Sequence, residues 1–285
     1  MAIAKEKITG KSRFLVYFAR SMAEPVLFSF SAYAKYTLFA TISFLLLACS
    51  SEDANDCIKT AGKTVEKEVK VGSFTKIRTE TDVRLLLRDG PEQKVMVKTD
   101  KNLMDNVRVK VENGVLSARY NGSCNLVRGY GLTQLIVTAP DITEIRNASA
   151  FEVASDGVLS YPKLTLISNT SIRGVEKIRK SGGFFLNLDV EKLNVRCNGI
   201  SLLKLKGNAT LLNVKFNDES PRLEAEDLIV QKVRVFNRGA NKIIVNPQQE
   251  LSGIITGTGD VIAINRPPIV DVEQRFSGRL IFKDQ

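Results

Sequence analysis

The chain has 285 residues, of which 44% are hydrophobic and 25% are charged, and it contains neither histidine nor tryptophan. The absence of histidine excludes imidazole bases, Ser-His-Asp and Cys-His nucleophile systems, and histidine-ligated metal sites. The net charge is +10, but residues 49–285 contribute only +6, which indicates a mildly basic surface rather than a nucleic-acid footprint. We therefore expect no cofactor, no metal and no nucleic-acid partner.

A nearly apolar run from Tyr36 to Ala48 precedes Cys49. The run has 13 residues, which is short for a membrane-spanning helix but typical of the hydrophobic core of a secretory signal. Its end, Leu-Leu-Ala-Cys, resembles a bacterial lipobox and implies cleavage before Cys49 and lipid attachment to its thiol. We expect residues 1–48 to be a lipoprotein signal peptide, with residues 1–21 a candidate gene-model extension. The alternative is a short membrane helix with an incidental cysteine.

The residues after Cys49 are small and acidic, reading Ser-Ser-Glu-Asp-Ala-Asn-Asp. Such a stretch is typical of a solvated tether that spaces a domain from a membrane. Acidic residues beside the anchor also resemble a surface-export signal of lipoproteins, with a plain tether as the alternative. We expect residues 49–66 to be a lipid-anchored acidic tether, on an outer-membrane protein displayed at the cell surface.

Three cysteines remain after the anchor, and an exported domain lies in an oxidising compartment. Cys197 alternates with polar residues in Leu-Asn-Val-Arg-Cys-Asn, so it is predicted to be a small buried residue. Cys57 ends the tether and Cys124 lies in the turn-like Asn-Gly-Ser-Cys-Asn. We expect a Cys57–Cys124 disulfide that fastens the tether to the domain, and three free thiols are the alternative.

Residues 67–285 consist of short alternating runs separated by turn signals, such as Arg-Asp-Gly-Pro at 88–91 and Glu-Asn-Gly at 112–114. Similar runs start at Leu193, Leu212, Val233 and Gly253, which are 19, 21 and 20 residues apart. A period near twenty residues, with about two short strands per repeat, predicts an all-β fold of the β-solenoid type. The alternative is an antiparallel β-sandwich. Because an uncovered end of such a stack would be an aggregation edge, we expect a cap.

The order of three pieces in this body is informative: VGSFTKIRTETDVRLLLRDG at 71–90, LTQLIVTAPDITEIRNASAFEVASDGVL at 132–159 and GTGDV at 257–261. Together they resemble the putative auto-transporter adhesins with a head GIN domain. The resemblance covers residues 67–285 and implies an exported protein or lipoprotein with a right-handed parallel β-solenoid body. The family often repeats Gly-Ser-Gly-Asp, whereas this chain has one such element, Gly-Thr-Gly-Asp at 257–260.

Basic residues at outward positions of neighbouring repeats could line up into one stripe. They are Lys204, Lys206, Lys215, Lys232 and Arg234. Such a stripe predicts binding of a glycan or another anionic partner, namely an acidic polysaccharide, lipid headgroups or the cell wall. The alternative is a surface that serves only solubility.

Without histidine, an enzyme would have to use carboxylates, lysine or arginine. Glu224, Glu226 and Asp227 are close enough in sequence for paired-carboxylate sugar cleavage, but acidic pairs on exposed strands are ordinary surface. We therefore expect no enzyme activity. The sequence predicts a lipid-anchored, non-catalytic binding or adhesion domain, with the membrane, a glycan or a surface protein as partner. The alternatives are a structural envelope scaffold and a histidine-free polysaccharide lyase or hydrolase.

Overall fold

The computed structural model describes residue 36 and residues 56–122, 124–168, 179 and 181–283. The contacts divide the chain into two units, Met1–Ala54 and Asn55–Gln285, and the sheet belongs to the second. In the part of the chain that is described, no helix has the length and apolar character needed to cross a membrane. Apart from Tyr36, the expected signal peptide at 1–48, Cys49 and the first residues of the expected tether lie outside the described residues.

The second unit is built almost entirely from strands, whose side chains alternate between the core and the surface. In β7, for example, buried and half-buried side chains alternate along all seven residues. A single described 3-10 helix, η1 (Lys101–Asn106), follows β4. The strands are β1 (Thr64–Glu68), β2 (Lys76–Thr81), β3 (Val83–Asp89), β4 (Lys94–Asp100), β5 (Val107–Glu112), β6 (Val115–Tyr120), β7 (Thr133–Ala139), β8 (Glu144–Ser149), β9 (Val153–Leu159), β10 (Lys163–Ser168), β11 (Phe184–Cys197), β12 (Leu202–Phe216), β13 (Arg222–Asn237), β14 (Ile243–Ile255), β15 (Val261–Ala263), β16 (Ile269–Gln274) and β17 (Leu280–Phe282).

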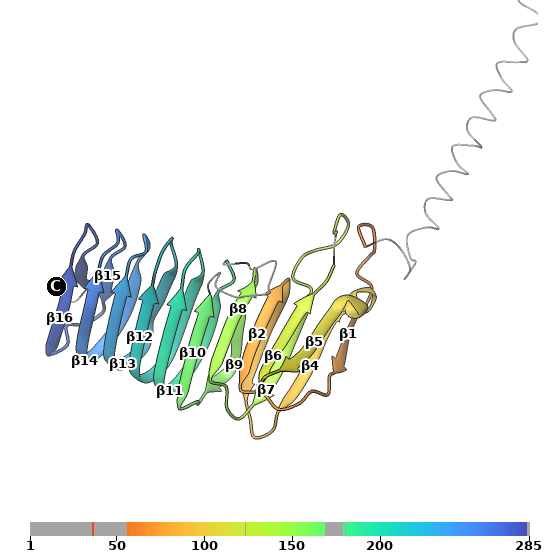
Figure 1. Ribbon diagram of the computed structural model, residues 1–285, viewed down its shortest axis with the longest axis horizontal. Helices are drawn as coiled ribbons and strands as arrows, with labels where there is room; N and C mark the ends of the chain where they lie inside the picture. The colour runs from red at the N-terminus through yellow and green to blue at the C-terminus, as the bar shows by residue number, and fades with distance from the viewer. Residues whose placement is uncertain (1–35, 37–55, 123, 169–178, 180, 284–285) are drawn as a thin grey trace, which may run out of the picture. The chain divides into compact units, whose positions relative to one another are not determined.

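All these strands belong to one sheet, which curls so that two walls face each other across the core. The β2 wall runs, in order of pairing, through β5, β6, β2, β8, β10, the later halves of β11 to β14, and β16. The β3 wall runs through β1, β4, β7, β3, β9, the earlier halves of β11 to β14, and then β15 and β17. Figure 1 shows the strands from β16 to β5 side by side.

Long strands carry the chain from one wall to the other. β12 and β13 pair in parallel over both of their halves, with a register shift between Lys204 and Gly207 that bends the pair. At this bend Gly207 has a φ of +106°, and a Cβ there would lie 2.0 Å from the carbonyl oxygen of Leu188. Only glycine fits both the backbone angle and the space.

The expected right-handed parallel β-solenoid is wrong as a description of this sheet. The sheet is mixed, because β1 with β4, β4 with β7, and β5 with β6 pair antiparallel. Where two short strands per repeat were expected, β11 to β14 are single strands of 13 to 16 residues that curl from wall to wall. The result is a strongly curled, half-barrel-like sheet. The β-sandwich alternative is closer, since two walls cover one core.

The predicted distribution of side chains is confirmed locally. Leu203 and Leu205 are buried, whereas Lys204 and Lys206 between and after them are exposed. Cys197 is free and buried, as its alternation predicted. The two-residue period of a strand therefore predicts which side chains face the core, although it does not predict how the strands are arranged in the sheet.

Candidate functional site

The five predicted basic residues lie on two different walls. Lys204 and Lys206 are in the earlier half of β12, on the β3 wall. Lys215 is in the later half of β12, and Lys232 and Arg234 are in the later half of β13, all on the β2 wall. Because β12 bends between its halves, the structure brings three of the five together and separates the other two from them.

Lys204 and Lys206 line a groove of about 740 Å³ on the β3 wall, together with Phe185, Asn187 and three carboxylates. The carboxylates belong to Glu224, Glu226 and Asp227. Lys204 Nζ lies 3.2 Å from Glu224 Oε2, and Arg222 pairs with the other oxygen. Burial opposes ionisation of Glu224, but the hydrogen bond from Lys204 and the nearby Arg222 charge outweigh it and lower the pKa of the carboxyl. Two lysines facing three carboxylates do not make an anion site.

The later halves of β11, β12 and β13, together with β10, carry a larger set of cations on the outer side of the β2 wall. Of the twelve outward positions of these segments, six are basic and none is acidic. We call these six residues the basic face: Lys163, Lys192, Arg196, Lys215, Lys232 and Arg234. Three of them were missed by sequence reasoning, because only the register shows which side chains share a wall.

Parallel pairing places cations of the basic face beside one another. Lys163 is the register partner of Lys192, and Arg196 is that of Lys215. Adjacent strands are about 4.8 Å apart, so each pair holds two like charges close together. Between these rows, Asn213 Nδ2 donates a hydrogen bond of 2.9 Å to Asn194 Oδ1. The amide contact links neighbouring strands and supports the spacing of the charges on either side.

Little negative charge offsets the basic face. Among the described residues its one ion pair joins Lys232 Nζ to Glu250 Oε2, at 3.8 Å, on the side towards β14. Lys215 Nζ lies 5.7 Å from the centre of the Phe236 ring, in a cation–π contact. An array of like charges without matching carboxylates concentrates positive potential and attracts anions. The basic face is therefore the candidate binding surface.

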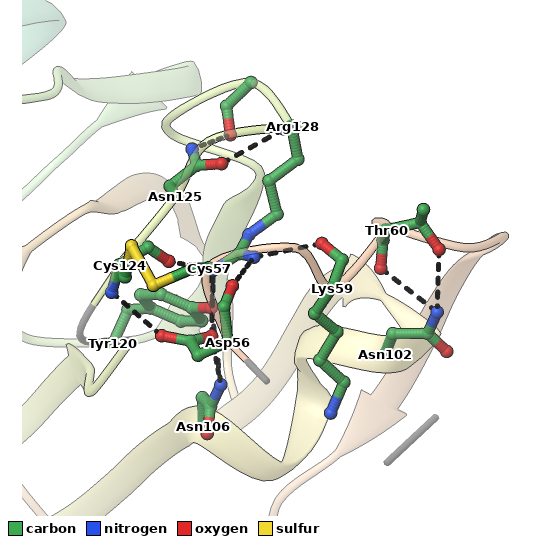
Figure 2. Close-up of polar contacts among 11 residues, drawn as sticks. Asp56, Cys57, Lys59, Thr60, Asn102, Asn106, Tyr120, Cys124, Asn125 and Arg128 are labelled. Carbon is green, nitrogen blue, oxygen red and sulfur yellow. Dashed lines mark hydrogen bonds and ion pairs between the residues drawn. A yellow bond between two sulfur atoms is a disulfide. The ribbon is translucent and has the colours of Figure 1, made fainter. Parts of the chain in front are cut away.

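A second feature fastens residues 56–59, which precede β1, to the loop that follows β6. Cys57 and Cys124, the two cysteines that the sequence analysis pairs, form a disulfide with their Cα atoms 4.5 Å apart. Beside it, the backbone N–H of Leu126 donates to the carbonyl of Cys57 at 3.0 Å. Figure 2 shows the bridge among the polar groups that surround it.

Arg128 is the centre of this cluster, and its side chain is only 3% exposed. Its Nη1 donates to the carbonyl oxygens of Asp56, at 2.6 Å, and of Lys59, at 3.0 Å. Its Nη2 donates to Asp56 Oδ1 at 2.9 Å, and to the Tyr120 hydroxyl and the Cys124 carbonyl at 3.0 Å each. Figure 2 shows Arg128 reaching across to the segment that holds Asp56 and Lys59. We call this group, with the disulfide, the tether clamp.

A cleft of about 420 Å³ lies next to the tether clamp, between the ends of β2 and β6 and the following loop. At its edge Thr81 has a φ of +56°, which is strained for a β-branched residue. Thr81 Oγ1 both donates to the Tyr120 carbonyl, at 2.9 Å, and accepts from the Tyr120 N–H, at 3.1 Å. These contacts account for the strain, because they hold the turn between β2 and β3 against β6.

The comparisons with known proteins agree with the fold. The family model described as "Putative auto-transporter adhesin, head GIN domain" matches residues 73–267. A putative adhesin from Bacteroides fragilis is 20% identical with a TM-score of 0.68, over 77% of this chain and 97% of its own. A putative adhesin from Parabacteroides distasonis is 16% identical, with a TM-score of 0.55 over 78% and 97% of the two chains.

A putative lipid binding protein from Parabacteroides distasonis is also similar, with 14% identity and a TM-score of 0.52 over 77% of this chain and 97% of its own. At these identities the likeness shows a shared fold. No curated protein matches the chain. The family and these structures are named for adhesion or binding rather than for an enzyme activity. The family resemblance seen in the sequence is confirmed, and the chain belongs to the family of putative auto-transporter adhesins with a head GIN domain.

Proposed function

We propose that the domain is a non-catalytic adhesion module whose basic face binds an acidic polysaccharide. The observation that supports this most directly is the charge of the β2 wall, where six of twelve outward positions are basic and none is acidic. A linear polyanion can cross successive strands and meet cations on each of them. Such binding needs an open face rather than an enclosed cavity, and the curled sheet offers one.

An acidic polysaccharide fits this face better than a lipid surface does. Proteins that bind at a membrane surface insert apolar side chains below the headgroups. The apolar residues among the outward positions are not available for this: Ile167 is buried, and Leu211 and Phe236 are half-buried. The large exposed hydrophobic side chains of the domain, such as Ile200 and Phe276, lie outside the basic face.

Catalysis finds no support in the candidate carboxylates. Both carboxylate oxygens of Glu224 are in ion pairs, one with Lys204 and one with Arg222. The lowered pKa of Glu224 keeps it ionised, so Glu224 cannot be the protonated acid of a glycosidase pair. The names of the family and of the similar structures also favour adhesion or binding.

The test is the binding of polygalacturonate to the purified protein, measured by calorimetry at low and high salt. Two variants remove the same charge: Lys215→Ala with Arg234→Ala on the basic face, and Lys204→Ala with Lys206→Ala in the groove. At about 1 kcal/mol per cation near an anionic surface, the first pair weakens binding about 30-fold. The groove pair leaves binding within about threefold, since Lys204 and Lys206 already face carboxylates.

Two results would contradict the proposal. Equal loss in both pairs would mean that only net charge matters. Binding to vesicles of anionic lipid without binding to the polysaccharide would make the lipid headgroup the ligand instead. High salt weakens true binding at the basic face, because screening shortens the reach of its charges.

We further propose that Cys49 carries lipid and that the domain is displayed at the outer surface of the outer membrane. The lipobox-like sequence before Cys49 and the adhesin name of the family support this. Proteinase K added to intact cells then removes the domain while a periplasmic control protein survives. Survival of the domain until the outer membrane is opened would refute surface display. A Cys49→Ala chain that stayed membrane-bound through another signal would refute the anchor.

A structural role in the envelope is the second candidate. One observation favours it, namely that within the described residues the strands at both ends of the sheet are paired on one side only. Such edges can pair with further strands, which is how a scaffold would extend.

A further inference from the structure

The two ends of the sheet are open edges. Following the pairings along the β2 wall, β5 is the first strand and β16 the last. Within the described residues β5 pairs only with β6, and β16 only with β14. Each edge therefore presents a row of backbone N–H and C=O groups that can pair with another strand. The cap expected from the sequence does not cover either edge in this part of the chain.

Both edges also leave core side chains partly uncovered. In β5, Val107, Val109 and Val111 pack against the core but remain only partly buried. In β16, Val270 is 37% exposed, although its register partner Leu251 is fully buried. An added strand would bury these valines as the next strand does elsewhere in the wall. Burial of apolar area at about 25 cal/mol per Å² would then favour pairing at both ends.

The outward side chains of the two edge strands have opposite charge. In β5 the outward positions are Arg108, Lys110 and Glu112; Lys110 Nζ pairs with Glu112 Oε1 at 2.7 Å, so Arg108 supplies the net positive charge. In β16 the charged residues are Asp271 and Glu273; Glu273 pairs at 2.7 Å with Arg275 just after the strand, so Asp271 supplies the net negative charge. These side chains lie on the same outer side of the β2 wall, because both strands belong to that wall. Pairing of β16 with β5 of another copy would therefore set acids beside bases.

The net charges of the two ends favour one arrangement. Two copies joined through β16 would place Asp271 near its own counterpart, and like charges on neighbouring strands are destabilising. Two copies joined through β5 would place Lys110 near its own counterpart, although Arg108 of one copy could then face Glu112 of the other. Only contact between unlike ends brings opposite net charges together, so head-to-tail contact is favoured.

We propose that the domain assembles head to tail with further copies of itself, by adding β16 of one copy to β5 of the next. The contact is heterologous, so it does not close and can extend into a row of copies. The β3 wall contributes less, since its last strand β17 has only three residues. This inference stands apart from ligand binding: the basic face lies on inner strands of the wall and stays exposed in such a row.

Charge reversal of one end at a time tests the proposal. The full chain, purified in mild detergent, is studied by sedimentation velocity over a range of concentrations. Wild-type protein is expected to form oligomers that grow with concentration and dissociate in high salt. Asp271→Lys with Glu273→Lys makes both ends basic, and Arg108→Glu with Lys110→Glu makes both ends acidic. Each variant alone is expected to remain monomeric.

An equimolar mixture of these two variants is the decisive sample. Each basic end now meets an acidic end of the other variant, so the mixture is expected to recover wild-type oligomers. Asp189→Lys with Asp227→Lys is the matched control, since it changes the charge equally at exposed inner strands and should leave assembly intact. Wild-type protein that is monomeric at every concentration would overturn the proposal. So would single-end variants that assemble like wild type, or a mixture that stays monomeric.

Discussion

Replacing Arg128 by methionine should release the tether clamp. Methionine has a similar length but no charge, so five hydrogen bonds disappear, including those to the carbonyl oxygens of Asp56, Lys59 and Cys124. The Asp56 carboxylate, whose side chain is 18% exposed, keeps its contacts with the Cys124 N–H at 3.0 Å and the Asn106 amide at 3.4 Å. It loses the Arg128 cation, which is the partner that carries charge in this cluster.

Removing one partner of a buried ion pair costs about 3–5 kcal/mol, and the residual exposure of Asp56 places this case near about 3 kcal/mol. The loss is local, because the disulfide still joins Cys57 to Cys124. Hydrogen exchange is therefore the most direct assay. The amides of Cys124 and Leu126, which donate to Asp56 and Cys57, should exchange roughly 100-fold faster, since about 1.4 kcal/mol corresponds to a tenfold change.

A double variant and a control make this reasoning refutable. Asp56→Asn added to Arg128→Met should recover at least about 1 kcal/mol, because the largely buried Asp56 charge that had lost Arg128 is removed. Arg119→Met, the same substitution at an exposed arginine beside the cleft, should leave the two exchange rates unchanged. Exchange in Arg128→Met that matches wild type would show that the disulfide alone holds the segment. A double variant no better than the single one would show that the Asp56 charge is not the cause.

Four further outcomes are expected. Replacing Cys57 and Cys124 by serine removes a cross-link across 67 positions and should lower the free energy of unfolding by about 4 kcal/mol in the chain-entropy model; an unchanged urea midpoint would contradict this. Burial raises the pKa of Cys197 to about 12, so a thiol reagent at about pH 8 should label it only after unfolding. Because burial favours the protonated thiol, titration of Cys197 should not affect the free energy of unfolding below its ordinary pKa of 9.0. As the pH rises from there towards about 12, the free energy of unfolding should fall, and urea denaturation at several alkaline pH values can measure this. Gly207→Ala should destabilise by about 2 kcal/mol or more in thermal melts, whereas Gly114→Ala, with φ of +71° but open space around it, should cost about 1 kcal/mol.

The alternation of side chains made the burial pattern predictable, but it could not determine strand direction. Parallel and antiparallel strands share the same two-residue period, so β4 and β5 look like the strands beyond them. One signal was present: Asn113 and Gly114 form a two-residue turn with φ of +50° and +71°, between antiparallel β5 and β6. An Asn-Gly pair between alternating runs is typical of a hairpin, and it argued against a wholly parallel stack.

The buried asparagines at the turns illustrate a second point. Asparagine readily adopts left-handed backbone angles in turns, yet Asn237 does not have a positive φ. Its buried side chain instead accepts from the Gly239 N–H at 3.0 Å and donates to the Gly259 carbonyl at 2.9 Å. Asn147 likewise donates to the carbonyls of Phe151 and Gly183. Both residues satisfy backbone groups that the turns leave unpaired, a role that local propensity does not reveal.

The candidate site was predictable only in part, because its members meet through register. Lys215, Lys232 and Arg234 were identified from alternation, whereas Arg196 joins Lys215 only once β11 and β12 are aligned. Arg128 and Asp56 are 72 positions apart, and nothing near either residue signals the other. Contacts that depend on long-range alignment of the chain are those that a single sequence leaves undetermined.

The tether clamp also decides where a mechanical load enters the domain. An adhesin is pulled from its attachment point, and with the lipid anchor proposed above at Cys49 that pull would travel along the chain ahead of Asp56. Without the disulfide, tension would reach β1 and peel it from β4, breaking the antiparallel hydrogen bonds one after another. With Cys57 bonded to Cys124, the tension passes into the loop after β6 and bypasses β1. The resistance of the attachment to force is then set by a covalent bond and the strands behind it, rather than by a five-residue edge strand.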